Sequence, residues 1–251
     1  MRRTLFILLL FIPLYLSGQV ISSTVSYATG PRTYLDVIND GNTKGWYIAE
    51  VGDLTKDGTD SVSVWADHLG SGRNLLAADN TKAQPIWITD YLDFNGAEST
   101  MKTGAYTFAQ PVMIYMVLKQ VTYTFSPPDY LFDGIVAGKT RIYQYEITPA
   151  IVASADTPSD GNSDLALDTW GILRALYNGA SSKLQINTET AVTGNFGSDY
   201  AGGFTIGSYG DTPATRNADI QVREIILRNK ADAEADQTLI LNYLNTKYSV
   251  Y

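Results

Sequence analysis

The chain has 251 residues, of which 45% are apolar and 18% charged, proportions that describe a globular chain with a core and exclude a disordered one. The formal net charge is −8, and no basic cluster is longer than Arg2 and Arg3, which excludes a general affinity for nucleic acid because phosphate binding needs clustered Lys and Arg. The absence of Cys excludes disulfides, thiolate metal sites and cysteine nucleophiles.

The N-terminus has the pattern of a targeting segment. Two arginines precede an apolar run from Leu5 to Leu16, and the small residues Ser17 and Gly18 follow. This pattern predicts a secretory signal peptide over residues 1–18, cleaved before Gln19. The run is shorter than the ~20 residues that a membrane-spanning helix needs. A retained N-terminal anchor is the alternative, and either reading places the protein outside the cell or on its surface.

Residues 19–45 are polar, and we interpret them as a leader or edge segment that precedes one domain over residues 46–251. A single β domain of this length is common. An exposed polar edge segment could pair with a neighbouring copy by strand addition, so self-assembly through residues 19–45 is one expectation.

Short runs with strand character then follow one another along the domain, separated by turn residues, as in β-sandwiches. They lie at residues 46–50, 62–67, 84–88, 91–97, 111–118, 130–134, 140–147, 203–207 and 219–228. The run at 111–118 is continuously apolar and bounded by Pro and Lys, which favours a strand buried on both faces over a short helix.

Residues 169–187 predict a β-hairpin. In its second half Leu184 and Ile186 alternate with polar residues, which is the period of a half-buried strand. Asn178 and Gly179 supply the positive φ angles that a tight connection needs.

The C-terminal residues 232–248 predict one amphipathic helix. Apolar residues recur at helical spacing from Leu239 to Tyr248. Acidic residues fill the first turn and Lys247 lies in the last, as the helix dipole favours.

The glycine-rich loop after the second run resembles a pattern of the concanavalin A-like, or LamG-like, domain family. The matching residues are Trp65, Asp67, Gly70, Gly72 and Asn74, and further matches include Leu92, Phe94, Asn95 and Gly96. In order and spacing the matches cover about residues 46–248. The resemblance implies an all-β fold: a two-sheet antiparallel jelly-roll sandwich with a short C-terminal helix.

Calcium is the cofactor that this resemblance suggests. If the glycine loop lies beside the start of the last strand, Asp67, Asn74 and Asp219 could converge as the hard oxygen ligands that this ion takes. The alternative, which we favour, is that Asp67 and Asn74 cap turns through hydrogen bonds to the backbone. The acidic loop at 156–164 lacks the closing Glu of an EF-hand and is interpreted as a solvated loop.

Sugar recognition needs exposed aromatic rings, and four tyrosines are candidates: Tyr143, Tyr145, Tyr200 and Tyr209. Tyr143 and Tyr145 share one strand face, so we expect both to be exposed or both to be core. Tyr200 and Tyr209 lie in glycine-rich loops, where binding residues concentrate. Core positions are expected for Trp46, Trp65, Trp87 and Trp170.

Catalysis has weaker support. Retaining glycosidases need two neighbouring carboxylates, whereas Glu146 and Glu224 stand alone on their strands. The single histidine, His68, lies in the glycine loop, and Arg223 with Glu224 is interpreted as a structural ion pair.

The sequence therefore favours a secreted, non-catalytic binding protein that recognises a glycan or takes part in cell-surface adhesion. One alternative is a structural subunit of an extracellular filament, surface layer or virion. A polysaccharide hydrolase or lyase is the second alternative.

Overall fold

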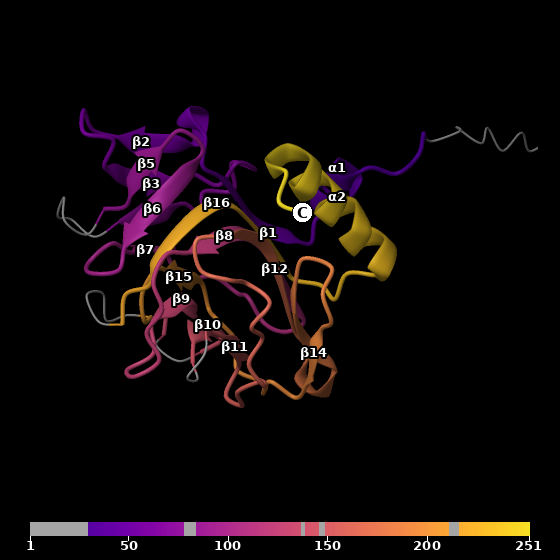
Figure 1. Cartoon of the computed structure of the whole chain (residues 1–251). Coiled ribbons are helices and arrows are strands. Elements are labelled where there is room, and N and C mark those ends of the chain that lie inside the picture. The colour runs from indigo at the N-terminus through magenta and orange to yellow at the C-terminus, as the bar shows by residue number, and fades with distance from the viewer. Residues whose placement is uncertain (1–29, 78–83, 137–138, 146–148, 211–215) are drawn as a thin grey trace, which may run out of the picture. The chain divides into compact units, whose positions relative to one another are not determined.

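The computed structural model describes residues 30–77, 84–136, 139–145, 149–210 and 216–251, whose strands form two antiparallel sheets packed as a sandwich (Figure 1). One compact unit extends from Thr33 to Tyr251. The two sheets and the C-terminal helix confirm the predicted fold. The predicted signal peptide lies outside the described residues. Within the ranges given above, none of the helices has the length and hydropathy that crossing a bilayer requires.

Sheet A contains eight strands of the described chain, seven of them in the order β14-β13-β12-β8-β16-β6-β5. Its strands are β1 (Thr43–Ile48), β5 (Ile86–Ile88), β6 (Tyr91–Asn95), β8 (Val112–Gln120), β12 (Trp170–Tyr177), β13 (Ser182–Ile186), β14 (Val192–Gly194) and β16 (Asp219–Arg228). Strands β6 and β1 lie end to end along one side of β16, because β6 pairs with residues 219–222 and β1 with residues 224–228.

Sheet B has the order β11-β10-β9-β15-β7-β4-β3-β2 within the described residues. Its strands are β2 (Leu54–Lys56), β3 (Val62–Trp65), β4 (Leu75–Ala77), β7 (Met101–Lys102), β9 (Tyr130–Gly134), β10 (Arg141–Gln144), β11 (Ile151–Ser154) and β15 (Phe204–Ile206). Helices α1 (Tyr34–Ile38) and α2 (Glu234–Tyr248) cover the face of sheet A that points away from sheet B (Figure 1). From Thr33 onward, the segment predicted as a polar leader thus supplies α1 and the start of β1.

Strand β8 lies in the middle of sheet A and contributes to two hydrophobic layers. Alternate side chains enter the core between the sheets, namely Val112, Ile114, Met116 and Leu118. The intervening ones pack under the helices, namely Met113, Tyr115 and Val117. The continuous apolar run in the sequence therefore corresponds to a strand covered on both faces, as predicted.

The predicted hairpin is formed by β12 and β13. They pair antiparallel and are joined through the 3-10 turn η3 (Gly179–Ser181). Gly179 has a φ of 53°, in the left-handed region that glycine adopts at no steric cost, whereas the positive φ expected at Asn178 is wrong, because its φ is −153°.

Two of the four tryptophans are core residues. Trp46 and Trp65 are buried, whereas Trp87 and Trp170 are half-buried at the edges of the two hydrophobic layers. The indole N–H of Trp65 donates to the carbonyl of Ile48 at 2.8 Å, so the buried ring leaves no unpaired donor.

Arg228 is fully buried on the helix-facing side of β16. Its guanidinium donates to the Asp232 carboxylate at 2.7 Å, the Val37 carbonyl at 2.6 Å, the Thr43 hydroxyl at 2.8 Å and the Asp40 carboxylate at 2.9 Å. Burial raises the pKa of Asp40, but hydrogen bonds from Arg228 and its neighbours hold that pKa well below its usual range. One cation thus joins α1, β1, β16 and the segment that leads into α2.

Glu224 is the second buried charge on this side of β16. Its carboxylate accepts hydrogen bonds from the Trp46 indole at 2.7 Å, the Tyr248 hydroxyl at 2.7 Å and the Lys247 ammonium at 2.8 Å. The structural role expected for Glu224 holds, but the predicted partner is wrong, because Arg223 instead pairs with Asp90 at 3.1 Å. Glu224 anchors the last turn of α2 to the sheet.

Removing the Arg228 cation should destabilise the domain strongly. The substitution Arg228→Leu leaves the buried Asp232 carboxylate without its cation, with the Tyr115 hydroxyl still donating to it, and we expect the free energy of unfolding to fall by about 3–5 kcal/mol. Denaturant unfolding followed by circular dichroism measures this. As a control, Lys56→Ala removes a partly exposed ion pair with Asp60 and should cost less than about 1 kcal/mol. Equal losses for the two variants would contradict the role assigned to Arg228.

Buried tyrosines should make the domain sensitive to alkali. Burial raises the pKa of Tyr47, Tyr115, Tyr243 and Tyr248 well above the usual 10. In the unfolded chain these hydroxyls ionise near pH ~10, so the free energy of unfolding should be steady up to about pH 9 and decrease above it. Unfolding curves between about pH 8 and pH 11 test this. The decrease should be smaller in Tyr248→Phe, which lacks one of these buried hydroxyls.

Candidate functional site

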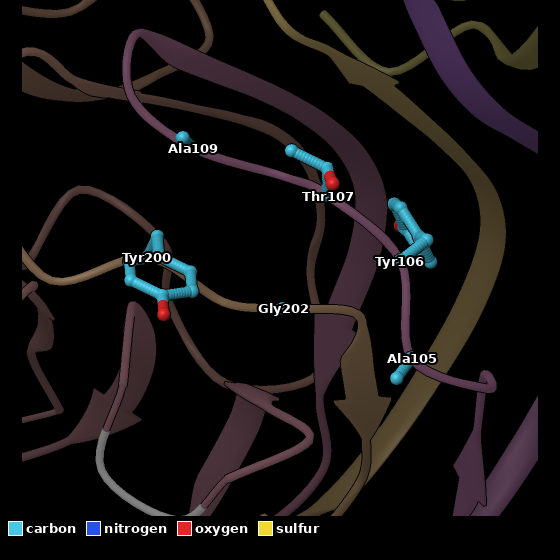
Figure 2. Close-up of a pocket in the computed structure, with 6 residues that line it drawn as sticks. All are labelled: Ala105, Tyr106, Thr107, Ala109, Tyr200 and Gly202. Atoms are coloured by element: carbon cyan, nitrogen blue, oxygen red, sulfur yellow. The ribbon is translucent and has the colours of Figure 1, made fainter.

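Two open hollows lie on either side of the backbone segment 199–202, which leads into β15. The first, of about 530 Å³, is lined on its other side by Ala105, Tyr106, Thr107 and Ala109 from the loop between β7 and β8 (Figure 2). The second, of about 420 Å³, is lined by Ile135, Val136 and Lys139, which follow β9. Both include Ala105, Tyr200 and Gly202, and we call them together the Tyr200 hollow.

Tyr200 is the most exposed of the large apolar and aromatic side chains in the described part of the chain, at 63%. Figure 2 shows its ring on one side of the first hollow and the 105–109 segment on the other. Val136, which lines the second hollow, is 55% exposed. The hollow therefore presents an aromatic ring and aliphatic surface directly to water.

Hydrogen bonds from several segments fix the backbone beneath Tyr200. The Gln110 side-chain amide and the Thr140 hydroxyl both donate to the Asp199 carbonyl, at 2.9 and 3.1 Å. On the other side of the ring, the Tyr106 N–H donates to the Gly202 carbonyl at 3.1 Å. The backbone that carries the ring is thus held by the scaffold, which limits the backbone entropy that a ligand must remove on binding.

One ion pair lies at the rim of the hollow. The Lys139 ammonium is 2.7 Å from the Asp199 carboxylate, and both side chains are partly exposed. The hydrogen bond to Asp199 raises the pKa of Lys139 above its usual value, which keeps the amine charged. The rim therefore offers hydrogen-bond donors and acceptors beside the exposed ring.

The other three predicted sugar-binding tyrosines lie together elsewhere, on the outer face of sheet B. Tyr130 stacks on Tyr143 with ring centroids 5.2 Å apart, and Tyr209 meets Tyr130 edge-on at 4.7 Å. Tyr145 lies 5.9 Å from Tyr143. We call these four residues the tyrosine face. Tyr200 lies away from the tyrosine face. It precedes β15, whose first residue pairs with residue 134 at the end of β9, whereas Tyr130 lies at the start of β9.

The expectation that Tyr143 and Tyr145 are both exposed or both core is wrong. Tyr143 is 5% exposed and Tyr145 is 48% exposed, because β10 ends at residue 144 and Tyr145 lies beyond the sheet. Tyr130 and Tyr143 cover one another's rings, so little of either is free to meet a ligand. Tyr200 and Tyr145 are the candidate tyrosines with substantial exposed surface.

The predicted calcium ligands do not converge in one place. The Asp67 carboxylate accepts hydrogen bonds from the backbone N–H groups of Trp46 and Leu69 and from the Ser71 hydroxyl, and the Asn74 carbonyl oxygen accepts from the Asp67 N–H. These two residues hold the glycine loop as turn caps. Asp219 begins β16 opposite Asn95, whereas Trp46 pairs with residue 226, seven residues and ~23 Å further along that strand.

Of the residues considered for catalysis, the structure describes Glu224 and His68. Glu224 is fully buried and bound by Trp46, Tyr243, Lys247 and Tyr248. Glu146 lies outside the described residues. His68 contacts the carboxylates of Asp53 and Glu50, neither of which was singled out from the sequence.

Sequence reasoning identified Tyr200 but missed Lys139, Asp199, Thr107 and the rest of the hollow. These residues come from loops that are distant in the sequence and meet only through the pairing of β15 with β7 and β9. The available local signal was one aromatic residue in the small-residue stretch 198–203, and that signal pointed to Tyr200.

No protein-family model matches the sequence, and the search of curated proteins also found no match. Solved structures are similar at low identity. A mutant of Trypanosoma rangeli sialidase displaying trans-sialidase activity has a TM-score of 0.60 and 11% identity, over 84% of this chain and 34% of that chain. Trypanosoma rangeli sialidase in complex with sialic acid has a TM-score of 0.58 and 12% identity, over 82% and 33%.

A further similar structure concerns botulinum neurotoxin type C, whose cell entry is described as dependent upon interaction with two ganglioside molecules. Its TM-score is 0.55 and its identity 13%, over 84% of this chain and 53% of that chain. The chain thus spans about a third of the sialidase chains and about half of the neurotoxin chain. These similarities show the β-sandwich fold.

Gly203 should be essential to the shape of the hollow. Its φ is 118°, and an added Cβ would lie 2.6 Å from the Gly104 carbonyl oxygen. We expect Gly203→Ala to lower the free energy of unfolding by about 1–3 kcal/mol, since both the backbone conformation and the close approach become strained. In the control Gly58→Ala the added Cβ meets no atom within 4 Å, and stability should change by less than about 1 kcal/mol. Thermal or denaturant unfolding compares the two, and equal effects would contradict the prediction.

Proposed function

We propose that this protein binds carbohydrate without transforming it, and that the Tyr200 hollow is the binding site. The observation that carries the proposal is the 63% exposed Tyr200 ring, held at the border of an open hollow by a hydrogen-bonded backbone. The apolar face of such a ring can stack on the C–H face of a pyranose, while its hydroxyl stays in water.

The rim supplies polar groups of the kinds that sugar hydroxyls need. The Asp199 carboxylate has acceptor sites beyond the one used by Lys139, and the Lys139 ammonium has further donors. Charged groups make stronger hydrogen bonds than neutral ones. A ring for stacking and a charged pair for hydroxyls on one rigid rim are the elements of a carbohydrate site.

The arrangement favours binding over hydrolysis by a pair of carboxylic acids, the mechanism from which sialidases with a tyrosine nucleophile depart. Glycosidases generally use two carboxyl groups, about 5–5.5 Å apart in retaining enzymes and ~6.5–9.5 Å apart in inverting ones. Among the described residues that line the hollow, Asp199 is the one carboxylate, and it is paired with Lys139. A pair of acids with separate roles is therefore missing from the described lining.

Two further observations support the proposal. The similar structures include a sialidase with sialic acid bound and a neurotoxin described as interacting with gangliosides. The signal-like pattern of residues 1–18 favours export, which would bring the protein to glycans on cell surfaces.

Replacing the exposed ring should abolish most of the binding. We expect Tyr200→Ala to weaken affinity for the best ligand on a glycan array at least about tenfold, the effect of losing a central aromatic contact. Titration calorimetry with that glycan measures the change. Tyr145→Ala is the matched control, because it removes an exposed tyrosine from the tyrosine face and should leave the affinity unchanged.

Three results would contradict this proposal. A loss of binding in Tyr145→Ala alone would move the site to the tyrosine face. No binding across the array would argue against carbohydrate recognition, and release of free sugar from a bound glycan would show an enzyme.

A further inference from the structure

A second set of side chains, away from the described hollow, meets on the surface beside β1. The Nδ1 atom of His68 lies 2.7 Å from Oδ2 of Asp53 and 3.7 Å from Oε1 of Glu50. One ligand atom from each of the three side chains lies within 4.8 Å of the others. We propose that Glu50, Asp53 and His68 bind a divalent transition metal, with zinc the best match.

Two loops bring these residues together, and the fold fixes both of them. Glu50 and Asp53 flank the 3-10 turn η1 (Val51–Asp53), in which residues three apart lie on the same side. The Asp53 N–H donates to the Glu50 carbonyl at 3.0 Å, and the Asp53 carbonyl accepts from the Ala66 N–H at 2.7 Å. The two carboxylates are therefore held on one side of a turn that is tied to Ala66, in the segment between β3 and His68.

Trp46 holds His68 in position through its backbone and its ring. Its backbone N–H donates to the Trp46 carbonyl at 2.7 Å, and its ring lies edge-on to the Trp46 ring with centroids 4.5 Å apart. Trp46 is itself buried and donates to Glu224. The imidazole thus rests against a fixed surface with Nδ1 directed at the two carboxylates.

The donor set distinguishes zinc from calcium. An imidazole nitrogen with two carboxylate oxygens is a combination that zinc accepts, whereas calcium takes oxygen ligands alone. Three protein ligands leave one tetrahedral position for water or a ligand atom. The histidine and Glu50 side chains are 36% and 51% exposed, so the site is open to solvent.

His68 lies within ion-pair distance of both carboxylates, but Asp53 alone is close enough for a hydrogen bond, at 2.7 Å against 3.7 Å for Glu50. The Glu50 carboxylate makes no hydrogen bond within the described chain and nevertheless lies beside the same nitrogen. A metal ion bound beside Nδ1 of His68 would give the Glu50 carboxylate a close partner. The site does not involve the Asp67 carboxylate, which is occupied by the loop backbone and Ser71.

The chain is well suited to a decisive test, since it has one histidine and no cysteine. Full-length protein, free of any histidine tag and stripped of metal with EDTA, would be titrated with zinc chloride by calorimetry. We expect one zinc ion per chain with a micromolar dissociation constant. The substitution His68→Gln should weaken binding at least tenfold, and Glu50→Gln severalfold. The carboxylate control Asp57→Asn, in an exposed turn, should bind as the unaltered chain does.

Cobalt gives a second readout, because a paramagnetic ion bound to His68 lies beside Trp46 and should quench its fluorescence. Quenching that is saturable in the unaltered chain and needs severalfold more cobalt in Glu50→Gln supports the site. This variant changes only an exposed side chain, so its folding should be intact. Three results would overturn the proposal: absence of stoichiometric zinc binding, equal binding by His68→Gln, or displacement of zinc by an equimolar amount of calcium.

Discussion

The outer face of β16 depends on two charges that are buried beneath the helices. Arg228 and Glu224 flank Ile226 on that face, and each is fully enclosed. An isolated buried charge is very unfavourable, so each requires a complete set of partners. The partners of Arg228 come from α1, β1 and the segment before α2, and those of Glu224 come from β1 and the end of α2. The position of both helices on sheet A follows from satisfying these two groups.

This constraint extends to the surface loops through Trp46. The same indole that donates to Glu224 supports the ring of His68, and the Trp46 backbone binds the carboxylate that caps the glycine loop. The 105–109 and 199–202 segments are organised differently, by hydrogen bonds from Gln110 and Thr140 and by glycines at positive φ. The polar surface near β1 therefore depends on the helix layer, whereas the Tyr200 hollow depends on how β15 enters sheet B.

Local patterns in the sequence were sufficient for several of the elements, whereas the two-sheet fold was expected from the resemblance of motifs to a known family. Three patterns could be recognised from residues that are close together in the sequence: the apolar run of β8, the turn glycine between β12 and β13, and the helical spacing of α2. The partner of Glu224 could not be predicted in this way, because Lys247 is 23 residues away and reaches it only after α2 folds back on the sheet. Contacts between distant residues also limited the prediction of the candidate site. Tyr200 could be identified as an aromatic residue among small ones, whereas Lys139 and Thr107 lie near it only because of strand pairing. The different exposure of Tyr143 and Tyr145 depended on where β10 ends, which strand alternation does not specify.

The position of β16 also has a consequence for biosynthesis. This strand lies between β8 on one side and β6 and β1 on the other, so the first described strand of the domain gains its partner from the last described one. Contacts between residues so far apart in sequence slow folding, because the entropy cost of closing a long loop arises before the contacts stabilise the chain. Until residues 219–228 have left the ribosome, β1, β6 and β8 expose unpaired edges and the helix-facing side of the sheet stays uncovered. A nascent chain in this state is a substrate for chaperones, and folding of the domain is expected to be completed once residues 219–228 have emerged.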